Sequence, residues 1–414
     1  MVELSGFHYR GQIPASKSIL NRLLIIQSFS ESLILVGDSD ADDVVKMRTG
    51  LRQVLRGEPA DCGAAGTTLR FLSLRASREL GTHHLSGSLR LFERPQTELS
   101  RLLTQLDCEA EIRLQRMTVR GQGWQRPLGD VVIDRSVSSQ FASALFLNAW
   151  NLDFDLRVQF IGEAVSESYF SMTLELLHQA GMIIDQTKDE TGTLVYRVPA
   201  GSQVTATKMI AEPDASSAFA LAATGIARAG VVEIENWPKV SLQPDSIFPE
   251  LLRSMNCSVS IQDHLLRVER LPNQVLGPID FNLRDAPDLF PVLAVLCSMA
   301  NGRSRLYGAP HLAHKESDRI GKVSELIKSL GRKVRVLPDG LEIDGRSDAN
   351  FPPSFKFTTD HDHRLAMAAA VARAAGAELE IQEPKVVDKS FPGFWKAIEV
   401  GRAQEETAQT SEPS

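Results

Sequence analysis

A repeated local pattern constrains the fold of this 414-residue chain more than any other feature of its sequence. Six times, a short polar or glycine-containing turn leads into an apolar helical run. The six segments are marked by Lys17, Thr67, Ser138, Ser216, Asp288 and His363, and successive markers are 50, 71, 78, 72 and 75 residues apart. Periods above about 50 residues exceed those of solenoid repeats, so we predict six small α/β units grouped into globular domains.

The segments between these helices show a second regularity. Short strands with Gly, Asn or Asp turns are predicted near Val231, His264 and Leu341. A second type of helix, with apolar residues at three- and four-residue spacing, recurs in RLLTQLDCEA, TLELLHQAG, IFPELLRSMNC and VSELIKSLGRKV. Each repeating unit is therefore predicted to contain strands and two helices.

The polar helix starts have an electrostatic meaning. A helix N-terminus carries unpaired N–H groups and a partial positive charge, which together favour an anion. Ser, Thr and Asp at such positions also serve as ordinary caps, so one start alone does not indicate a site. Here cations lie in or beside the starts, namely Lys17, Arg22, Arg70, Arg135 and Arg364. The pattern favours a locally positive site for phosphates and carboxylates.

Charge and cysteine content narrow the class of protein. The chain has 45 Lys and Arg against 52 Asp and Glu, a net charge of −7, which argues against a nucleic-acid-binding surface. Its start lacks the basic and apolar regions of a secretory signal, and no apolar run approaches membrane-spanning length. The four cysteines form no C-x-x-C pair, so we expect buried thiols rather than disulfides. We expect a cytoplasmic protein that binds neither membrane nor nucleic acid.

The segment from His311 is rich in charge. Lys315 and Arg319 are four residues apart, which predicts a shared helix face, with Glu316 and Asp318 beside them. A rival interpretation starts from the histidines, because His311 and His314, and His361 and His363, have spacings found in zinc sites. A zinc-dependent hydrolase is therefore an alternative, but the cations beside the first pair oppose a bound metal ion, and we expect no metal and no cofactor.

Ten motifs in register resemble those of the 5-enolpyruvylshikimate-3-phosphate (EPSP) synthase family, over about Ile13 to Phe394. They are P-x-S-K-S-x-x-N-R (Pro14–Arg22), A-G-T-x-x-R (Ala65–Arg70), R-P (Arg94–Pro95), S-V-S-S-Q-F (Ser136–Phe141), S-x-x-Y-x-x-M-T-L (Ser166–Leu174), D-A-S-S-A (Asp214–Ala218), P-D (Pro287–Asp288), K-E-x-D-R (Lys315–Arg319), D-H-R-x-A-M (Asp362–Met367) and K-x-F-P (Lys389–Pro392).

The resemblance implies a two-domain α/β fold of the enolpyruvyl transferase type, in which each domain has three repeated α/β units with inner helices and outer sheets. The domains would be residues 15–211, and residues 1–14 together with 212–400, closing on substrate like a clamp. The polar tail 401–414 is predicted to be disordered. We expect a monomer.

The resemblance also implies a reaction and its substrates. The enolpyruvyl group of phosphoenolpyruvate would pass to the 5-hydroxyl of shikimate 3-phosphate, through a tetrahedral intermediate that loses phosphate. Shikimate 3-phosphate would contact Lys17, Ser18, Arg22, Ser138, Ser139, Gln140, Ser166, Tyr169, Asp288, His311 and Lys315. Phosphoenolpyruvate would contact Lys17, Gly66, Arg94, Gln140, Arg319, Arg364 and Lys389. Two phosphates and two carboxylates require many cations and N–H donors in one place.

The same resemblance implies which residues transfer protons. Asp288 and Glu316 would serve as base and acid, with Lys17, His363 and Lys389 assisting. An ionised carboxylate can accept the hydroxyl proton, and a carboxyl crowded by anions has a raised pKa and can donate. The resemblance does not assign each proton to one residue.

Three departures from the family pattern concern Ala64 and His311, where the family usually has Asn, and Phe71, where proline is common. Gly66 leaves room where an alanine would crowd the site, which predicts inhibition by glyphosate. The sister enolpyruvyl transferase acting on UDP-N-acetylglucosamine is an alternative, although its loop cysteine has no counterpart near Arg94. A further alternative is a binding protein without catalytic activity. The joint presence of the candidate catalytic residues argues against it, namely Lys17, Asp288, Glu316 and Lys389.

Overall fold

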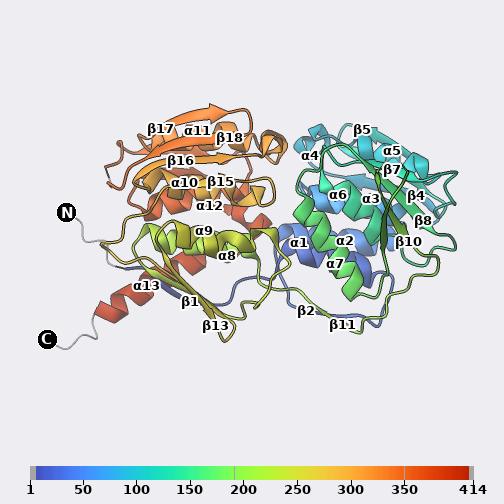
Figure 1. The fold of residues 1–414 in the computed structure, drawn as a ribbon, viewed down its shortest axis with the longest axis horizontal. Coiled ribbons are helices and arrows are strands. Elements are labelled where there is room, and N and C mark those ends of the chain that lie inside the picture. Colours follow the sequence, from blue (N-terminus) through green and yellow to red (C-terminus); the bar gives the residue numbers. More distant parts are fainter. Residues whose placement is uncertain (1–5, 191, 349, 410–414) are drawn as a thin grey trace. The chain divides into compact units, whose positions relative to one another are not determined.

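The computed structural model describes residues 6–190, 192–348 and 350–409, which form two compact units (Figure 1). One unit is the continuous segment Ser16–Ala211, called here the middle unit. The other, called the terminal unit, combines the N-terminal residues through Ala15 with the chain from Glu212 onward. No helix among the described residues is long and apolar enough to cross a lipid bilayer.

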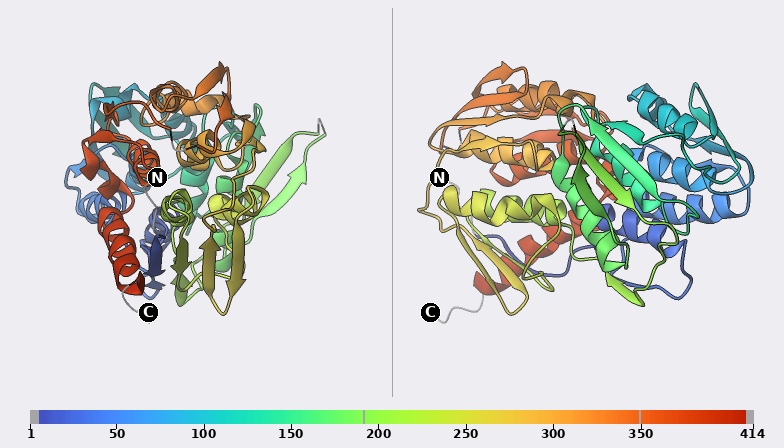
Figure 2. Two further views of the ribbon diagram at one scale, coloured as in Figure 1. Left: turned by 90° about the vertical axis from the view of Figure 1, so that its left-hand side faces the viewer. Right: turned by 45° about the vertical axis from the view of Figure 1, so that its right-hand side comes forward.

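The middle unit contains two four-stranded sheets and one two-stranded sheet. The first sheet has the order β3-β4-β6-β5 and the second β7-β8-β10-β9, while β2 pairs with β11. Their bounds are β2 (Ile34–Val36), β3 (Ala60–Asp61), β4 (Gly81–Ser86), β5 (Glu109–Arg113), β6 (Arg116–Gly121), β7 (Val131–Asp134), β8 (Leu156–Ile161), β9 (Asp185–Lys188), β10 (Leu194–Val198) and β11 (Lys208–Ile210). In the right-hand view of Figure 2 the green strands of the second sheet lie outside, in front of helices.

Helices of two kinds pack on these sheets. The buried helices are α1 (Lys17–Gln27), α3 (Gly66–Ser77) and α6 (Ser139–Leu147), and they contact one another. The others are the amphipathic helices α2 (Asp42–Leu55), α5 (Thr97–Gln105) and α7 (Glu167–Gln179), and the short α4 (Leu89–Glu93). In α3, 11 of the 12 residues are buried, because the other buried helices and the first sheet enclose it.

The terminal unit repeats the same plan. Its sheets have the orders β1-β12-β14-β13 and β15-β16-β18-β17, with β19 paired to β20. Their bounds are β1 (His8–Gly11), β12 (Val231–Ile234), β13 (Ser258–Gln262), β14 (Leu265–Glu269), β15 (Asp280–Asn282), β16 (Gly302–Tyr307), β17 (Lys333–Leu337), β18 (Gly340–Gly345), β19 (Phe355–Thr358) and β20 (Leu379–Gln382). The strands predicted near Val231, His264 and Leu341 are confirmed as β12, β14 and β18.

Helices of the terminal unit divide in the same way. The buried ones are α8 (Ala215–Ala227), α10 (Phe290–Met299) and α12 (His363–Ala374), which contact one another. The amphipathic ones are α9 (Phe248–Ser254), α11 (Arg319–Ser329) and α13 (Phe394–Gln409), and four 3-10 turns are η1 (Pro244–Ile247), η2 (Pro287–Leu289), η3 (Pro310–His314) and η4 (Pro384–Lys389). All 13 residues of α8 are buried, which explains why its sequence is rich in alanine.

The predicted α/β repeat is confirmed, and the strand pairings define it more closely. In each four-stranded sheet the first two strands are parallel, as β7 and β8 are, and the last two form an antiparallel hairpin. A parallel pair needs a crossover, which the buried helices α3, α6 and α10 supply in three of these sheets. The two-stranded sheets lack the hairpin, which accounts for the short first interval of 50 residues between helix markers.

Two strands reach their sheets from a distant part of the sequence. Strand β1 pairs in parallel with β12, although it leads along the chain into α1 of the middle unit. Strand β11 pairs in parallel with β2, although it leads into α8 of the terminal unit. Each unit therefore completes one of its sheets with a strand that the sequence joins to a helix of the other unit.

The C-terminal helix differs from the expected disordered tail. Helix α13 continues past Gly401 to Gln409, whereas disorder was predicted from 401 onward. Gly401 fits this helix against Phe7, since a Cβ there would lie 2.2 Å from the ring, and the residues that follow include good helix formers. The rest of the predicted tail, 410–414, lies outside the described residues.

Candidate active site

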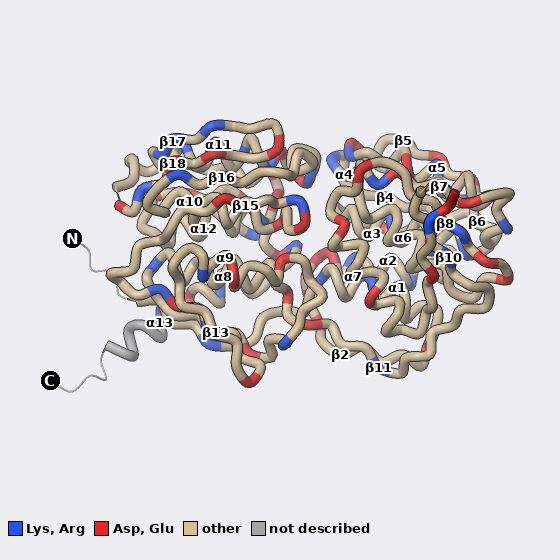
Figure 3. Tube along the Cα trace, viewed as in Figure 1, with Lys and Arg blue, Asp and Glu red and all other residues tan. Residues whose placement is uncertain are grey.

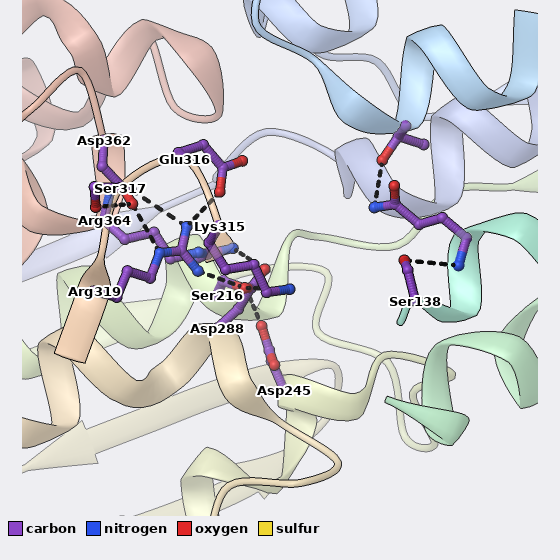
Figure 4. Close-up of polar contacts among 12 residues, drawn as sticks. Ser138, Ser216, Asp245, Asp288, Lys315, Glu316, Ser317, Arg319, Asp362 and Arg364 are labelled. Atoms are coloured by element: carbon purple, nitrogen blue, oxygen red, sulfur yellow. Dashed lines mark hydrogen bonds and ion pairs between the residues drawn. The ribbon is translucent and has the colours of Figure 1, made fainter. Parts of the chain in front are cut away.

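Arg319 is the centre of a buried charge cluster in the terminal unit (Figure 4). It is the first residue of α11, and its Nε donates to Asp362 Oδ2 over 2.8 Å. Its Nη1 donates to Asp288 Oδ1 over 2.8 Å, and its Nη2 to Glu316 Oε2 over 3.2 Å. Burial by itself would lower the pKa of Arg319, but these three carboxylates hold it well above its ordinary value. The guanidinium is permanently charged.

Asp288 is surrounded by cations. Besides Arg319, Arg364 Nη2 lies 3.0 Å from Asp288 Oδ2 and Lys315 Nζ lies 4.0 Å from Oδ1. Burial would raise the pKa of the Asp288 carboxyl, yet Arg364, Lys315 and Arg319 hold it well below its usual value. Asp288 is therefore ionised near neutral pH and can accept a proton once a ligand draws these cations away.

Glu316 joins the cluster from the other side. Its Oε1 lies 3.2 Å from Lys389 Nζ, and its Oε2 accepts from Arg319. Lys389 ends the 3-10 turn η4 and is buried. The terminal unit thus brings together Asp288, Lys315, Glu316, Arg319, Arg364 and Lys389, six of the residues that the sequence singled out.

One local prediction about this cluster is wrong. Lys315 and Arg319 do not share a helix face, because α11 begins only at Arg319 and Lys315 is extended with ψ −154°. Asp318 caps α11 and accepts from the Gly321 N–H over 3.0 Å, which ends the preceding loop before the helix. Both cations still reach Asp288, one from the loop and one from the helix.

The histidines that suggested a zinc site do not form one among the described residues. Among the described residues, no group of three or more His, Cys, Asp or Glu side chains could hold a metal ion. His361 is exposed and lies 3.1 Å from Glu383, whereas His363 is buried at the start of α12. Burial, with Lys315 adding to it, lowers the pKa of His311 to about 3, so that side chain is neutral. The geometry gives the zinc-hydrolase alternative no support.

Each of the six predicted turns leads into a buried helix, and at four of them a side chain caps that helix. Ser16, Ser138, Asp214 and Asp362 each accept a backbone N–H of the helix that they cap. Helix α3 begins after Ala65 without a side-chain cap, and α10 begins after the turn η2.

In the middle unit, Arg70 organises the start of α6. Its Nη1 donates to Gln140 Oε1 over 2.6 Å and to Ser138 Oγ over 3.4 Å, and its Nη2 donates to the Pro95 carbonyl over 3.2 Å. The guanidinium also lies 4.6 Å from the centre of the Phe141 ring. From the sequence, Arg70 was only one of several cations beside helix starts, and it was not among the predicted site residues. Its place in the A-G-T-x-x-R motif was the one pattern that could have identified it.

Gln140 is held in place from two sides. Besides accepting from Arg70, its Nε2 donates to Thr67 Oγ1 over 3.1 Å, which links α6 to α3. Its neighbour Ser139 is buried as the first residue of α6. The backbone N–H groups of this helix start, with Ser138 and Ser139, form a group of donors suited to an anion.

Arg94 lies against the backbone of Gly66. A Cβ built at Gly66 would lie 2.8 Å from Arg94 Nη1 and 3.1 Å from its Cζ. Arg94 itself is extended with ψ 149° directly after α4, as expected for a residue before proline. Gly66 therefore allows the guanidinium to reach the start of α3.

Lys17 pairs with an acid that the sequence did not reveal. Its Nζ lies 2.8 Å from Asp43 Oδ2, and both side chains are largely shielded. Asp43 lies in the first turn of α2, where an acidic residue is an ordinary finding. No pattern in the sequence distinguished it from a residue that only stabilises the helix.

Arg22 is a buried cation held by neutral groups. Its Nε donates to Thr173 Oγ1 over 2.7 Å, and its Nη atoms donate to the Ser18 carbonyl over 2.7 Å and the Tyr169 carbonyl over 3.2 Å. In the part of the chain that the structure describes, no carboxylate lies within ion-pair distance of it. Burial lowers the pKa of Arg22 to about 10, so the guanidinium is still charged near neutral pH.

Ser166 stands at the start of α7 in a left-handed conformation, with φ 52°. The residue that follows, Glu167, accepts from Arg135 Nη1 at 3.1 and 3.2 Å. Arg135 lies in the loop that leads to Ser138, and its carbonyl accepts from the Val165 N–H over 3.2 Å. The Arg135–Glu167 pair thus connects the loop before α6 with the start of α7.

Basic residues gather locally in a chain that is acidic overall. Figure 3 shows blue and red segments interspersed along both units. Among the cations described above, Lys17 and Arg364 lie in the first turns of buried helices. Arg22 and Arg70 lie within such helices, and Arg319 begins α11. The others lie on loops or 3-10 turns. The negative net charge therefore describes the general surface rather than these positions.

Comparison of folds defines the class of protein. An EPSP synthase structure from Acinetobacter baumannii superposes with a TM-score of 0.72 at 19% identity, over 96% of each chain. The enolpyruvyl transferase NikO from Streptomyces tendae superposes with a TM-score of 0.68 at 14% identity, over 96% of this chain and 95% of that one. The fold is therefore that of the enolpyruvyl transferases.

Comparison of sequences narrows this class. The family described as EPSP synthase (3-phosphoshikimate 1-carboxyvinyltransferase) matches residues 34–398. A 3-phosphoshikimate 1-carboxyvinyltransferase of Syntrophobacter fumaroxidans is 33% identical, over 96% of this chain and 97% of that protein. The chain belongs to the EPSP synthase family, which acts on small molecules.

Proposed function

We propose that this protein transfers the enolpyruvyl group of phosphoenolpyruvate to the 5-hydroxyl of shikimate 3-phosphate and releases phosphate. The observation that carries the proposal is the cluster in the terminal unit, where Lys315, Arg319, Arg364 and Lys389 surround the carboxylates of Asp288 and Glu316. Four cations beside two candidate proton-transfer groups suit an anionic substrate that must be both bound and protonated. Family membership and the named relative support the same reaction.

In the terminal unit, Arg319 and Arg364 bind the carboxylate of phosphoenolpyruvate, because a planar guanidinium can donate two parallel hydrogen bonds. Lys389 contacts the phosphate of this substrate, and Lys315 with His311 contacts shikimate 3-phosphate. Substrate binding replaces part of the present ion pairing, since both arginines now donate to Asp288.

In the middle unit, the capped start of α6 binds the 3-phosphate of the acceptor through Ser138 and Ser139, with Ser166 from the start of α7. Ser18 and Arg22 take its carboxylate, and Tyr169 lines this region. Arg22 suits the role because its buried charge now meets only neutral groups. Phosphoenolpyruvate is held through its phosphate by Lys17, Gly66, Arg94 and Gln140.

The chemistry proceeds in two steps. In the addition, the 5-hydroxyl gives its proton to a base and its oxygen bonds to C2 of phosphoenolpyruvate. The carbon–carbon double bond takes up a proton at the methylene carbon, giving the tetrahedral intermediate. In the elimination, the new methyl group loses a proton, the C–O bond to phosphate breaks and the enol ether forms. Asp288 and Glu316 are the proton-transfer groups, and Lys17, His363 and Lys389 assist them or stabilise the departing phosphate.

The enzyme needs no metal or other cofactor for this reaction, because the cations of the chain supply the charge. We further propose that it works as a monomer in the cytoplasm, without a nucleic-acid or membrane partner.

Phosphate release tests the proposal. The purified protein is expected to release phosphate when phosphoenolpyruvate and shikimate 3-phosphate are both present, and to release none when either is omitted. UDP-N-acetylglucosamine replaces shikimate 3-phosphate in a parallel assay. Activity with that acceptor alone would favour the sister transferase, and binding of both substrates without phosphate release would indicate a binding protein.

A further inference from the structure

Asp245 is a buried acid beside the charge cluster that neither the motifs nor the proposed mechanism uses. It lies in η1, is 3% exposed, and its carboxylate accepts a hydrogen bond from Ser216 Oγ. The adjoining segment is fixed to the start of α8, because Gln243 Oε1 accepts from the Ala215 N–H over 2.9 Å and Gln243 Nε2 donates to the Pro213 carbonyl over 2.7 Å. Asp245 is therefore held rigidly.

Three charged groups from different parts of the terminal unit interact electrostatically with Asp245. They are Asp288 of η2, Arg364 of α12 and Asp214, which caps α8. In Figure 4, Asp245 lies at the lower edge of the cluster, opposite Glu316. Arg364 donates to Asp288 and is also attracted by Asp245, so two carboxylates compete for one guanidinium. Such competition is strong because these groups are shielded from water.

We propose that Asp245 is a positioning residue whose charge sets how strongly Arg364 binds the carboxylate of phosphoenolpyruvate. The inference rests on the proposed function. When Asp245 is neutral, it does not compete with the substrate carboxylate for the positive charge of Arg364. Ionised Asp245 draws the guanidinium toward itself and adds a negative charge beside an anionic ligand, which weakens binding.

The carboxyl of Asp245 changes its charge within the pH range of an ordinary enzyme assay. Burial, and then the negative charge of Asp288, raises the pKa of Asp245 to about 6. Asp245 is thus largely neutral below that pH and ionised above it, so binding of phosphoenolpyruvate should weaken as the pH rises. The Ser216 hydrogen bond acts in the opposite direction, because it favours the ionised carboxylate and lowers this pKa.

The test compares Asp245→Asn with the wild-type enzyme between about pH 5 and about pH 8. The readout is kcat/KM for phosphoenolpyruvate of the variant divided by that of the wild type. The ionisation of the substrate affects both values equally and cancels in this ratio. We expect this ratio to rise by roughly three- to tenfold with pH, because only the wild type gains a charge next to Arg364. A ratio that does not change with pH overturns the inference.

Ser216→Ala provides a second variant of opposite design, because it keeps Asp245 and removes only its hydrogen-bond donor. The fall in kcat/KM should move to higher pH, and an unchanged or lowered midpoint contradicts the inference. Asp344→Asn is the matched control, since Asp344 lies on β18 and pairs with Arg303 at 2.7 Å. It should follow the wild type, and a pH-dependent ratio in this control also overturns the proposal.

Failure of the proposed function is distinguishable in the same experiment. A wild-type enzyme that releases no phosphate contradicts that function, and the inference falls with it. A wild-type enzyme that is active, beside an Asp245→Asn variant with a flat ratio, contradicts the inference alone.

Discussion

Arg319 and Asp362 form an ion pair at 2.8 Å in which both side chains are almost fully shielded from water, 1% and 0% exposed. The pair joins the first residue of α11 to the cap of α12. Asp362 also accepts from Ser317 Oγ over 3.0 Å and from the Arg364 N–H over 2.9 Å. One buried carboxylate thus fixes two arginines that we propose as ligands of the substrate carboxylate.

Removing the charge of this carboxylate should destabilise the protein. Asp362→Asn leaves Arg319 buried with a weaker partner, which we expect to cost about 3–5 kcal/mol in the free energy of unfolding. The control, Asp344→Asn, breaks an exposed pair and should cost about 1 kcal/mol or less. Urea unfolding followed by circular dichroism measures both, and equal losses would show that burial of the pair contributes nothing.

Arg22 should behave in the opposite way. Its buried charge has only neutral partners, so Arg22→Met is expected to leave the unfolding temperature unchanged or to raise it. The same change should raise the KM for shikimate 3-phosphate about tenfold or more, because a charge-assisted hydrogen bond to its carboxylate is lost. Calorimetry and initial rates separate the two effects, while an unaffected KM would remove Arg22 from the acceptor site.

Gly66 is the position where one methyl group should matter most. A Cβ there would lie 2.8 Å from Arg94 Nη1, so Gly66→Ala must displace the guanidinium. We expect a several-fold higher KM for phosphoenolpyruvate and weaker inhibition by glyphosate, with little change in the KM for shikimate 3-phosphate. The wild type should be inhibited by glyphosate, and full turnover at millimolar glyphosate would contradict that expectation.

His311 should make the folded state sensitive to acid. Burial lowers its folded-state pKa to about 3, below the value of about 6.5 for an unfolded histidine. The unfolded chain therefore binds the proton first as the pH falls. The contribution to stability is fully present above about pH 6.5 and is lost progressively toward about pH 3. His311→Asn should flatten this part of the stability curve, as denaturant unfolding at several pH values can measure, and an identical slope would contradict it.

Local patterns predicted a good part of this architecture. Polar starts and apolar runs identified the buried helices, because a helix enclosed on all sides needs apolar residues after a capped first turn. The cysteines, expected as buried thiols, are free and buried. Lys315 shows the limit of such patterns, because four-residue spacing predicts a shared face only where a helix exists.

Partners distant in the sequence were not predictable in the same way. Asp43, Asp245 and Asp362 carry no local sign of their partners, and Arg70 only a weak one. Asp43 resembles any acidic residue of a first helical turn, and Asp362 any cap. Their importance arises from contacts across 26 residues for Lys17–Asp43 and 43 residues for Arg319–Asp362.

The sequence by itself determined the repeated α/β units, the helix starts and the family motifs, because these depend on neighbouring residues and on spacing along one helix or strand. Tertiary structure alone decided which carboxylate faces which cation. Packing of α8, α10, α11 and α12 brings Asp245, Asp288, Glu316 and Asp362 to the same few guanidinium and ammonium groups. In a region shielded from water, charge interactions depend on distances of a few ångströms, which no linear spacing specifies.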